Sequence, residues 1–564
     1  MSIVGKLGRA ANWAANTTYR VASLASRDSL RAMAARYPQA FVMSPESVEE
    51  RTIHLVVPTL MHVIRDVNRA ETSLSEAYLR NTVIDGIRTG LFNSYGERIL
   101  INQFRIKELL PLLEVPAKYE KRFVREAKKH GLIHEQIPEQ LFIPQDIAFR
   151  NRGDQRYTER TYSVYTRDGR TLRLTRVVNL DRVKTNDDNP SVLYVPGIAC
   201  NGKFFDFDDE SSLALDAADH SQWVYLFDPR GMGKNKGDFD FSCFLDSLIS
   251  NDLTAAADFV AGRPRPAKPV IIIGHSMGGM IAEFMLVRQS YKLAQIIKQL
   301  CGLDTRGLSR AEIAQILDNV HSTSDEQCAL LAEARNQLAL LQGVKGLVTI
   351  GSPKTFDKHN NLILPALLFL NILLPLLKQD KVPLDWLKFL VKLSPSFSSI
   401  ARLLINPDNF KEPNRFLAKM IDGGVDSFPL GVGFQLLKAI YSGQGIKRMD
   451  AGKFNYSAHL DYIPIDIPLY HLLSHADPLA PGYNLGFIDE GAFQFPRYRH
   501  RLKQIERIAD AAAVNRVDLH AGQSRVIGLV IPGVVHLDFF YGHVGIEIVR
   551  PLLDRIVKTI NQAG

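Results

Sequence analysis

The segment around Ser276 contains the residues best suited to chemistry. Four branched aliphatic residues, 270–273, lead into Gly274-His-Ser-Met-Gly278, and another glycine follows at 279. A short apolar run that ends in glycine is typical of a buried strand, and a helix is predicted from Met277 onward. Glycines on both sides of the serine allow a sharp, strained turn from strand to helix. Such a turn exposes the hydroxyl at a helix N-terminus, where N–H groups favour a developing negative charge. We therefore predict that Ser276 is a nucleophile.

A nucleophilic serine needs a carboxylate that orients its base, and Asp477 is the predicted acid. Serine at its ordinary pKa reacts poorly, so the base and the acid should follow later strands of the same sheet. Asp477 comes four residues after the apolar run 467–473, in a proline-rich turn. Asp461 and Asp466 precede that run and would lie at the opposite edge of the sheet. Capping of the turn is the alternative role for Asp477.

The predicted base is His536, which follows the last apolar run, 525–531, and precedes the final predicted helix. In this position its ring can turn back over the carboxyl edge of the sheet. His543 lies seven residues further along, about two helical turns. It is expected to support the site from outside or to cap the helix. His275, beside the serine, is interpreted as a packing residue.

Two backbone N–H groups are expected to bind the oxyanion that forms during attack on a carbonyl group. One belongs to Met277, and the other should come from the loop after the apolar run 192–195. In that loop Gly197 permits a tight turn, and we predict the Ile198 amide as the second donor. Cys200 has no basic residue near it in the sequence, so it is expected to be a buried small residue rather than a nucleophile.

The elements that position these groups are predicted to form a mostly parallel sheet. Short apolar runs alternate with helical stretches, a pattern typical of a sheet that helices cover on both faces. The six runs are 192–195, 223–227, 270–273, 346–350, 467–473 and 525–531. An alternating segment around Asp168-Gly169 predicts a hairpin before them.

A long insertion separates the fourth run from the fifth, and its roughly 115 residues far exceed an ordinary connection. It contains Leu362–Leu377, sixteen mainly apolar residues interrupted by two prolines and an asparagine. That stretch is too short to cross a bilayer. We predict a mainly helical, apolar cap that covers the site.

Residues 1–150 are predicted to be mostly helical and have no assigned role. Val56–Val67 and Leu109–Gly131 carry apolar residues at helical spacing, with Gly131 as a stop signal. The first 27 residues contain four basic and no acidic side chains, so a membrane-surface helix is an alternative to an ordinary one. They lack the apolar run of a secretory signal.

The composition is that of a globular chain: 564 residues, 46% hydrophobic and 23% charged. The net charge of +8 arises from 68 basic and 60 acidic residues, a mild excess that does not indicate nucleic-acid binding. The four cysteines form no CxxC or Cys/His pattern, so we expect no disulfide framework, no metal and no cofactor. A reducing compartment, the cytoplasm, is the predicted location, with peripheral membrane contact through the cap or the N-terminal helix as an addition.

The order Ser276, Asp477, His536 resembles that of the α/β-hydrolase superfamily, in its serine lipase and esterase branch. Asp228-Pro-Arg-Gly-Met-Gly-Lys-Asn is similar to the family's turn after a neighbouring strand, and His536-Leu-Asp-Phe539 resembles the end of acid-lipase-like enzymes. The family's usual His-Gly at the oxyanion loop is Pro-Gly here. The resemblance implies a mostly parallel eight-stranded sheet flanked by helices, with a helical cap insertion and a helical N-terminal extension.

The predicted domain organisation follows from these elements. A helical region of unknown role spans 1–150, and the catalytic core occupies 151–352, with the nucleophile, and 466–564, with the acid and the histidine. The cap occupies 353–465.

The leading functional hypothesis is a serine carboxylic-ester hydrolase that acts on a hydrophobic acyl ester, a small molecule or a lipid, through an acyl-enzyme. An acyltransferase or polyester-metabolising enzyme of the same fold is one alternative. Polyester synthases of this fold usually carry cysteine at the position of Ser276, which disfavours that branch. A catalytically silent scaffold that binds lipid or membrane is the other alternative, and the filled triad positions disfavour it.

Overall fold

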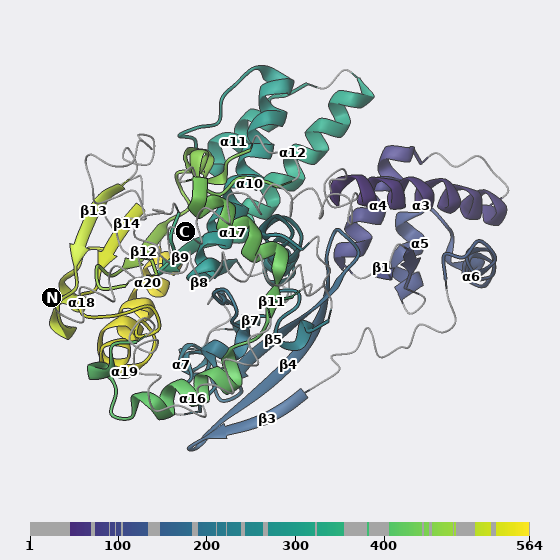
Figure 1. Ribbon diagram of the computed structural model, residues 1–564. Coiled ribbons are helices and arrows are strands. Elements are labelled where there is room, and N and C mark those ends of the chain that lie inside the picture. Colours follow the sequence, from purple (N-terminus) through teal and green to yellow (C-terminus); the bar gives the residue numbers. More distant parts are fainter. Residues whose placement is uncertain are drawn as a thin grey trace, which may run out of the picture.

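The computed structural model describes most of the chain between residues 45 and 562 (Figure 1). The described residues are 45–68, 74–89, 91–95, 98–102, 105–133, 147–182, 190–209, 211–220, 223–237, 243–262, 269–321, 324–354, 381–382, 405–442, 445–449, 454–477, 479–480, 502–519 and 526–562. Among them, no helix combines the length and the apolar character that crossing a membrane requires.

A ten-stranded sheet forms the body of the molecule, in the order β13-β14-β12-β9-β8-β6-β7-β5-β4-β3. Neighbours from β13 to β7 are parallel, whereas β3, β4, β5 and β7 pair antiparallel. The strands are β3 (Ile147–Arg152), β4 (Gln155–Tyr165), β5 (Thr171–Asn179), β6 (Ser191–Val195), β7 (Trp223–Phe227), β8 (Val270–His275), β9 (Val344–Ile350), β12 (Leu469–Leu473), β13 (Leu502–Arg507) and β14 (Val526–Val530).

The predicted sheet is confirmed, and it is two strands wider than expected. All six apolar runs are strands, and the hairpin around Asp168-Gly169 joins β4 to β5. The additional strands, β3 and β13, lie at the two edges and contain two and three charged residues, respectively. Polar edge strands lack the continuous apolar run of buried ones, so the sequence pattern did not reveal them. Because β3 begins at Ile147, the sheet starts four residues before the boundary predicted at 151.

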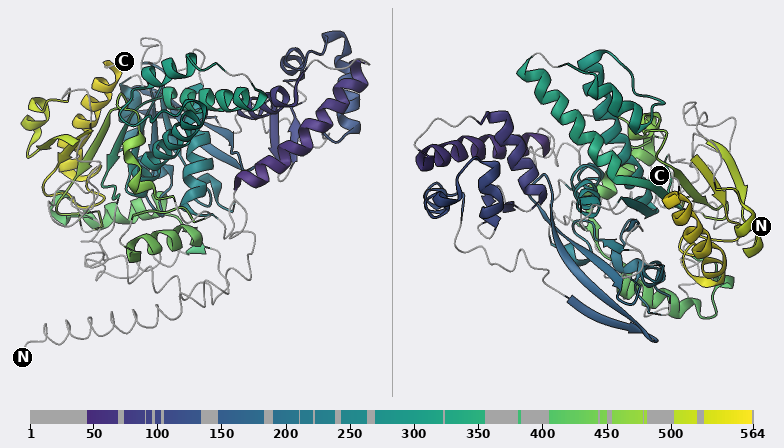
Figure 2. Two further views of the ribbon diagram at one scale, coloured as in Figure 1. Left: turned by 90° about the horizontal axis from the view of Figure 1, so that it is seen from above. Right: turned by 180° about the vertical axis from the view of Figure 1, so that it is seen from behind.

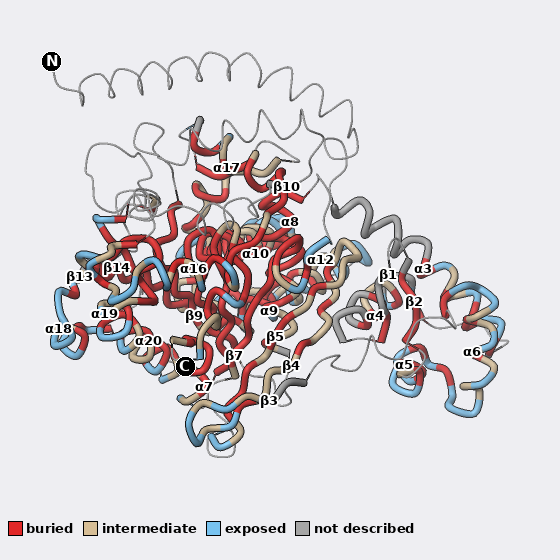
Figure 3. Tube along the Cα trace, turned by 60° about the horizontal axis from the view of Figure 1, so that its bottom comes forward, coloured by how far each residue is buried: buried red, intermediate tan, exposed pale blue. Residues whose placement is uncertain are grey.

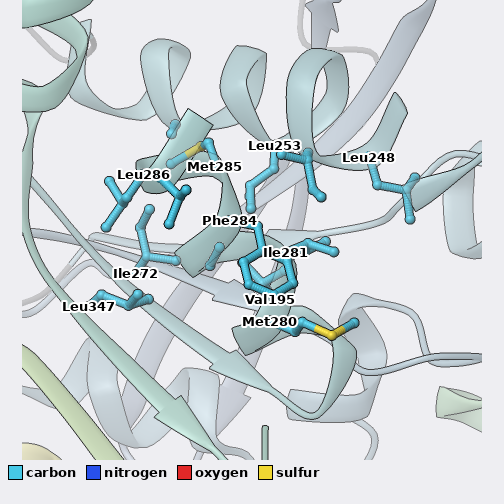
Figure 4. Close-up of a cluster of buried hydrophobic side chains, with 14 of the residues drawn as sticks. Val195, Leu248, Leu253, Ile272, Met280, Ile281, Phe284, Met285, Leu286 and Leu347 are labelled. Atoms are coloured by element: carbon cyan, nitrogen blue, oxygen red, sulfur yellow. The ribbon is translucent and has the colours of Figure 1, made fainter. Parts of the chain in front are cut away.

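Helices cover both faces of the sheet, because alternate residues of each buried strand face opposite sides. Ile272 belongs to the core shared with α9, α10 and α12, whereas Ile271 and Ile273 belong to the core shared with α7 and α20. Figure 4 shows the first of these cores, with Phe284 and Ile281 of α10 beside the strands. The helices of the body are α7 (Leu213–Asp219), α8 (Leu245–Ser247), α9 (Thr254–Gly262), α10 (Met277–Cys301), α11 (Arg310–Asp318), α12 (Asp325–Gly343), α18 (Ala511–Arg516), α19 (Gly542–Val544) and α20 (Arg550–Gln562).

The N-terminal helices pack around a separate core, beside the antiparallel end of the sheet (Figures 1 and 3). They are α3 (Pro45–Asn68), α4 (Glu76–Thr89), α5 (Ile106–Leu112) and α6 (Glu120–Lys129), and α4 contacts α9. A hairpin that the sequence did not predict, β1 (Phe92–Tyr95) and β2 (Arg98–Ile101), lies among them. The single helical run expected over 109–131 is divided between α5 and α6, since Glu114 has a positive φ and Pro116 follows. Gly131, the predicted stop, follows α6 with φ of 72°.

Part of the insertion between β9 and β12 lies over the carboxyl edge of the sheet. Its described elements are α16 (Pro413–Gly424), α17 (Leu430–Ser442) and the short pair β10 (Lys381–Val382) and β11 (Phe428–Pro429), and the two helices lie on the same side of the body (Figure 2). The Asn201 amide in the loop after β6 donates to the Gly424 carbonyl at 3.0 Å. The Asn406 amide donates to Asp538, in the loop after β14, at 2.8 Å. The apolar stretch Leu362–Leu377 and the predicted helix of the first 27 residues lie outside the described residues.

Candidate active site

Ser276 occupies the turn between β8 and α10, as the spacing of its glycines predicts. Its φ of 53° and ψ of −125° are strained for a residue with a side chain. The Ser276 amide donates to the Ile350 carbonyl at 2.8 Å, which fixes the turn against the end of β9. The backbone of Ser276, and with it the direction of the serine side chain, is therefore fixed by its hydrogen bond to β9.

Three glycines make this turn sterically feasible. A Cβ on Gly274 would lie 2.4 Å from the Gly279 Cα, and one on Gly278 would lie 2.1 Å from the Val195 carbonyl oxygen. A Cβ on Gly279 would lie 2.2 Å from the Ser352 hydroxyl oxygen. The backbones of β8, α10 and the loop after β6 thus approach more closely than any side chain permits.

Replacement of Gly278 by alanine tests this packing. The new methyl group meets backbone oxygens that cannot move aside, so we expect Gly278→Ala to lower the free energy of unfolding by about 3 kcal/mol. Gly423→Ala is the control, because its Cβ would meet nothing nearer than Phe207 at 3.3 Å. Chemical denaturation measures both variants. Equal stabilities for Gly278→Ala and the wild type would show that the close approach is not a constraint.

His536 and Asp477 form a buried hydrogen-bonded pair. His536 Nδ1 lies 2.8 Å from Asp477 Oδ2, and Asp477 is fully buried. The other carboxylate oxygen, Oδ1, accepts from the amides of Leu479 at 2.9 Å and Ala480 at 3.1 Å. Because a carboxylate accepts, Nδ1 carries the proton, and Nε2 of the neutral ring is left as the proton acceptor.

The turn after β9 brings this pair and the serine together. A Cβ on Gly351 would lie 3.2 Å from Asp477 Oδ2 and 3.5 Å from His536 Nδ1, and the preceding residue, Ile350, accepts the Ser276 amide. Ser276, Asp477 and His536 are therefore grouped around one turn, at the carboxyl ends of β8, β12 and β14.

The other acids and histidines that the sequence offered lie elsewhere. Asp466 accepts from Arg310 at 2.6 Å, and Asp461 lies 3.8 Å from Arg306. His543 is exposed, with its Nδ1 3.3 Å from the Asn409 carbonyl. None of these contacts involves Ser276.

His275 supports the site by packing, in the role that the sequence analysis gave it. Its ring stacks on Phe204 at 5.1 Å between centroids, and its Nε2 lies 2.9 Å from the His536 carbonyl oxygen. Burial, together with the neighbouring His536, lowers the pKa of His275 well below its ordinary value. A neutral ring that donates to the His536 carbonyl fixes the backbone of that histidine and does not take up protons.

The segments that carry the two predicted oxyanion donors adjoin the serine. Met277 is the first residue of α10, so its amide has no acceptor within the helix. The loop after β6 approaches from the other side, where a Cβ on Gly197 would lie 3.0 Å from the Ser276 Cβ. Ile198 follows, and Ala199 turns the chain with a φ of 59°. Cys200 is buried, and burial together with Asp426 raises the pKa of its thiol to about 12, which keeps it protonated.

A model of the Alpha/beta hydrolase family matches residues 192–483, more than half of the chain. The chain belongs to the Alpha/beta hydrolase family. No curated protein matches it.

Solved structures that resemble this α/β hydrolase include esterases and lipases. A thermophilic esterase from Thermogutta terrifontis is 12% identical with a TM-score of 0.36, and the match covers 71% of this chain and 99% of that one. A monoacylglycerol lipase from Paleococcus ferrophilus is 13% identical with a TM-score of 0.33, over 67% and 96% of the two chains. A putative lipase from Sulfolobus solfataricus is 13% identical with a TM-score of 0.37, over 74% and 99%. At these values the likeness carries no information about the substrate.

Asp228 organises the loops beside the site of this α/β hydrolase. Its two carboxylate oxygens accept from the amides of Gly202 at 2.6 Å and Lys234 at 2.9 Å. A Cβ on Gly233, which has a φ of 55°, would lie 2.3 Å from the Asp228 carboxyl carbon. The Asp-Pro-Arg-Gly turn singled out in the sequence therefore acts as a support for the loops after β6 and β7.

Asp538 is a supporting residue that the sequence analysis did not assign. Its Oδ2 accepts from the amides of Asn406 and Val535 and from the Asn409 side chain, at 2.8, 3.2 and 2.8 Å. Its Oδ1 is buried without a hydrogen-bond partner among the described residues. Burial raises the pKa of Asp538 to about 6, although these three hydrogen bonds oppose the shift. Its only signal in the sequence was its position two residues after His536.

The raised pKa of Asp538 predicts a specific dependence of stability on pH. Between the ordinary value of 3.8 and about 6, the folded chain holds a proton that the unfolded chain has released. The free energy of unfolding should therefore fall as pH rises through this window, by a contribution that Asp538→Asn removes. Denaturation curves at several pH values measure this difference, and Asp408→Asn, an exposed carboxyl in the same segment, is the control. Parallel pH profiles for the wild type and Asp538→Asn would contradict the prediction.

One group of potential metal ligands, Asp66, Glu126 and His130, occurs among the described residues, on the N-terminal helices. His130 Nε2 lies 3.2 Å from Asp66 Oδ2, and Lys129 lies 3.5 Å from Glu126. The ligand atoms are already paired with one another or with a cation, so the group gives no indication of a metal site.

Proposed function

We propose that this α/β hydrolase is a serine carboxylic-ester hydrolase. The observation that carries the proposal is the buried His536–Asp477 pair, which meets the strained Ser276 turn at the carboxyl ends of three strands. A nucleophile, a base with a free ring nitrogen and an acid that orients this base are the groups that acyl transfer requires.

Each step of the proposed reaction moves one proton. Ser276 Oγ attacks the ester carbonyl while His536 Nε2 takes the hydroxyl proton, and Asp477 stabilises the imidazolium that forms. The Ile198 and Met277 amides bind the oxyanion of the tetrahedral intermediate. The intermediate then breaks its bond to the alcohol, which leaves with the proton from His536. Water attacks the acyl-enzyme by the same sequence and releases the carboxylic acid.

Labelling with a fluorophosphonate tests the proposed nucleophile. We expect a single adduct on Ser276 by peptide mass spectrometry, and we expect Ser276→Ala to lower ester turnover by roughly 10⁴-fold or more. His536→Ala should slow both reactions because it removes the base. The matched control is His543→Ala, an exposed histidine that should leave both rates unchanged.

The outcomes of this experiment separate the alternatives. An adduct on Ser276 without ester turnover, but with acyl transfer to an added alcohol, would favour an acyltransferase. No adduct, with or without detergent micelles, would contradict the nucleophile assignment and favour a ligand-binding scaffold.

We further propose that the acyl group is hydrophobic. This proposal rests on the apolar composition of Leu362–Leu377 and on the position of the described part of the insertion, over the carboxyl edge of the sheet.

Replacement of residues 362–377 by a short Gly-Ser linker tests the acyl preference. The linker removes apolar side chains that would contact a long acyl chain, so kcat/KM for long-chain esters should fall towards that for short-chain esters. A series of nitrophenyl esters of increasing chain length measures the preference. A preserved preference for long chains would assign acyl recognition to another part of the molecule.

A further inference from the structure

One buried carboxylate, that of Asp426, connects the insertion to the loop that carries Ile198. Asp426 lies between α16 and β11, and its side chain is almost fully buried. Its Oδ2 accepts from the Asn201 side chain at 2.5 Å and from the Gly233 amide at 2.8 Å. Its Oδ1 lies 2.5 Å from Lys236 Nζ. The carboxylate thus binds the loop after β6 and the loop after β7 at once.

Backbone contacts reinforce this connection. The Asp426 amide donates to the Ala199 carbonyl at 2.8 Å, and the Asn201 amide donates to the Gly424 carbonyl at 3.0 Å. Between them, Cys200 and Val425 form an antiparallel bridge. The three residues that follow Ile198 therefore form a short antiparallel β-pairing with the insertion.

The conformation of this loop requires such support. Ala199 has a positive φ, which a residue with a side chain adopts only where the surroundings impose it. Ala199 is adjacent to Ile198, so release of its carbonyl from Asp426 would allow the Ile198 peptide to rotate. Asp228 also holds this loop, through Gly202, but Asp228 directly follows β7 in the body, whereas Asp426 belongs to the insertion.

We propose that Asp426 is a positioning residue that aims the Ile198 amide at the oxyanion, so that the reaction depends on the docking of residues 424–426. This inference rests on the proposed function, because it assumes that Ile198 binds an oxyanion. It gives the insertion a part in the chemical step in addition to substrate binding. Substrate contacts that stabilise the docked insertion would then accelerate the chemical step as well as binding.

Asp426→Asn is the first test, because it keeps the shape of the side chain but replaces one carboxylate oxygen by an NH2 group. This group would face another donor, either Lys236 or the pair Asn201 and Gly233. We expect kcat for a nitrophenyl ester to fall by about 10- to 100-fold, with KM within about threefold, because misplacement of an oxyanion donor weakens transition-state binding selectively. Asp422→Asn, an exposed carboxyl on α16, is the matched control and should leave both constants unchanged. A change in KM alone would indicate a role in substrate binding and overturn the proposal.

Exchange of the two partners supplies a rescue. In Asn201→Asp combined with Asp426→Asn, the amide donates from residue 426 to a carboxylate at residue 201, so the hydrogen bond is restored with reversed polarity. The Gly233 amide loses its acceptor in this double variant, because in the wild type the same oxygen, Asp426 Oδ2, accepts from both Asn201 and Gly233, so the recovery should be partial. We expect kcat of the double variant to exceed that of Asp426→Asn. A double variant no faster than Asp426→Asn would count against this specific pairing.

Hydrogen–deuterium exchange separates this proposal from the proposed function, because it needs no activity. In Asp426→Asn, amides of residues 198–202 should exchange at least about tenfold faster, while those of α10 keep their wild-type rates. If Asp426→Asn exchanges faster but the wild-type protein has no esterase activity, the connection between Asp426 and the loop is supported and the proposed reaction is rejected. Unchanged exchange at 198–202 would overturn the proposal whatever the kinetics.

Discussion

The close approach of three backbone segments at Ser276 is the constraint on which the rest of the site depends. Gly274, Gly278 and Gly279 leave no room for a Cβ, and the serine accepts a strained φ so that its hydroxyl clears the sheet. Strain of this kind persists only where the surrounding structure imposes it. Here apolar packing supplies that support: β8 contributes side chains to the cores on both faces of the sheet, and α10 covers one of these faces. A buried strand and a buried helix cannot shift without opening the core.

Parallel topology explains how residues far apart in the chain meet at this turn. The carboxyl ends of β8, β9, β12 and β14 share one edge, and register fixes their relative height. Ile350 accepts the serine amide, and Gly351 lies against the acid and the histidine. A shift of one strand by one residue would turn its side chains to the opposite face and separate these groups.

The sequence predicted the parts of the molecule that have local signatures. Buried parallel strands are apolar throughout, and Ser276, Asp477 and His536 each follow such a strand, so the fold class and the positions of these candidate residues in the sheet could be anticipated. The edge strands were missed because polar, partly exposed strands lack that signature. The first hairpin was missed because its strands, although they contain buried apolar residues, are only four residues long. The Asn201–Asp426 pair was missed for a different reason. Its members lie 225 residues apart, and neither has a neighbour that marks it.

Buried polar contacts attach the described segments of the insertion to the body at several points. Lys354 pairs with Glu283 of α10 at 2.7 Å, and its carbonyl accepts from Ser457, so the two ends of the insertion are joined. Asp538, two residues after His536, binds the segment of the insertion that contains Asn406. Asp426, in the insertion, binds the loop that carries Ile198. These last two carboxylates connect the insertion to both sides of Ser276. The loop of His536 and the loop of Ile198 are therefore both held by contacts with the same insertion, so their positions are coupled through it.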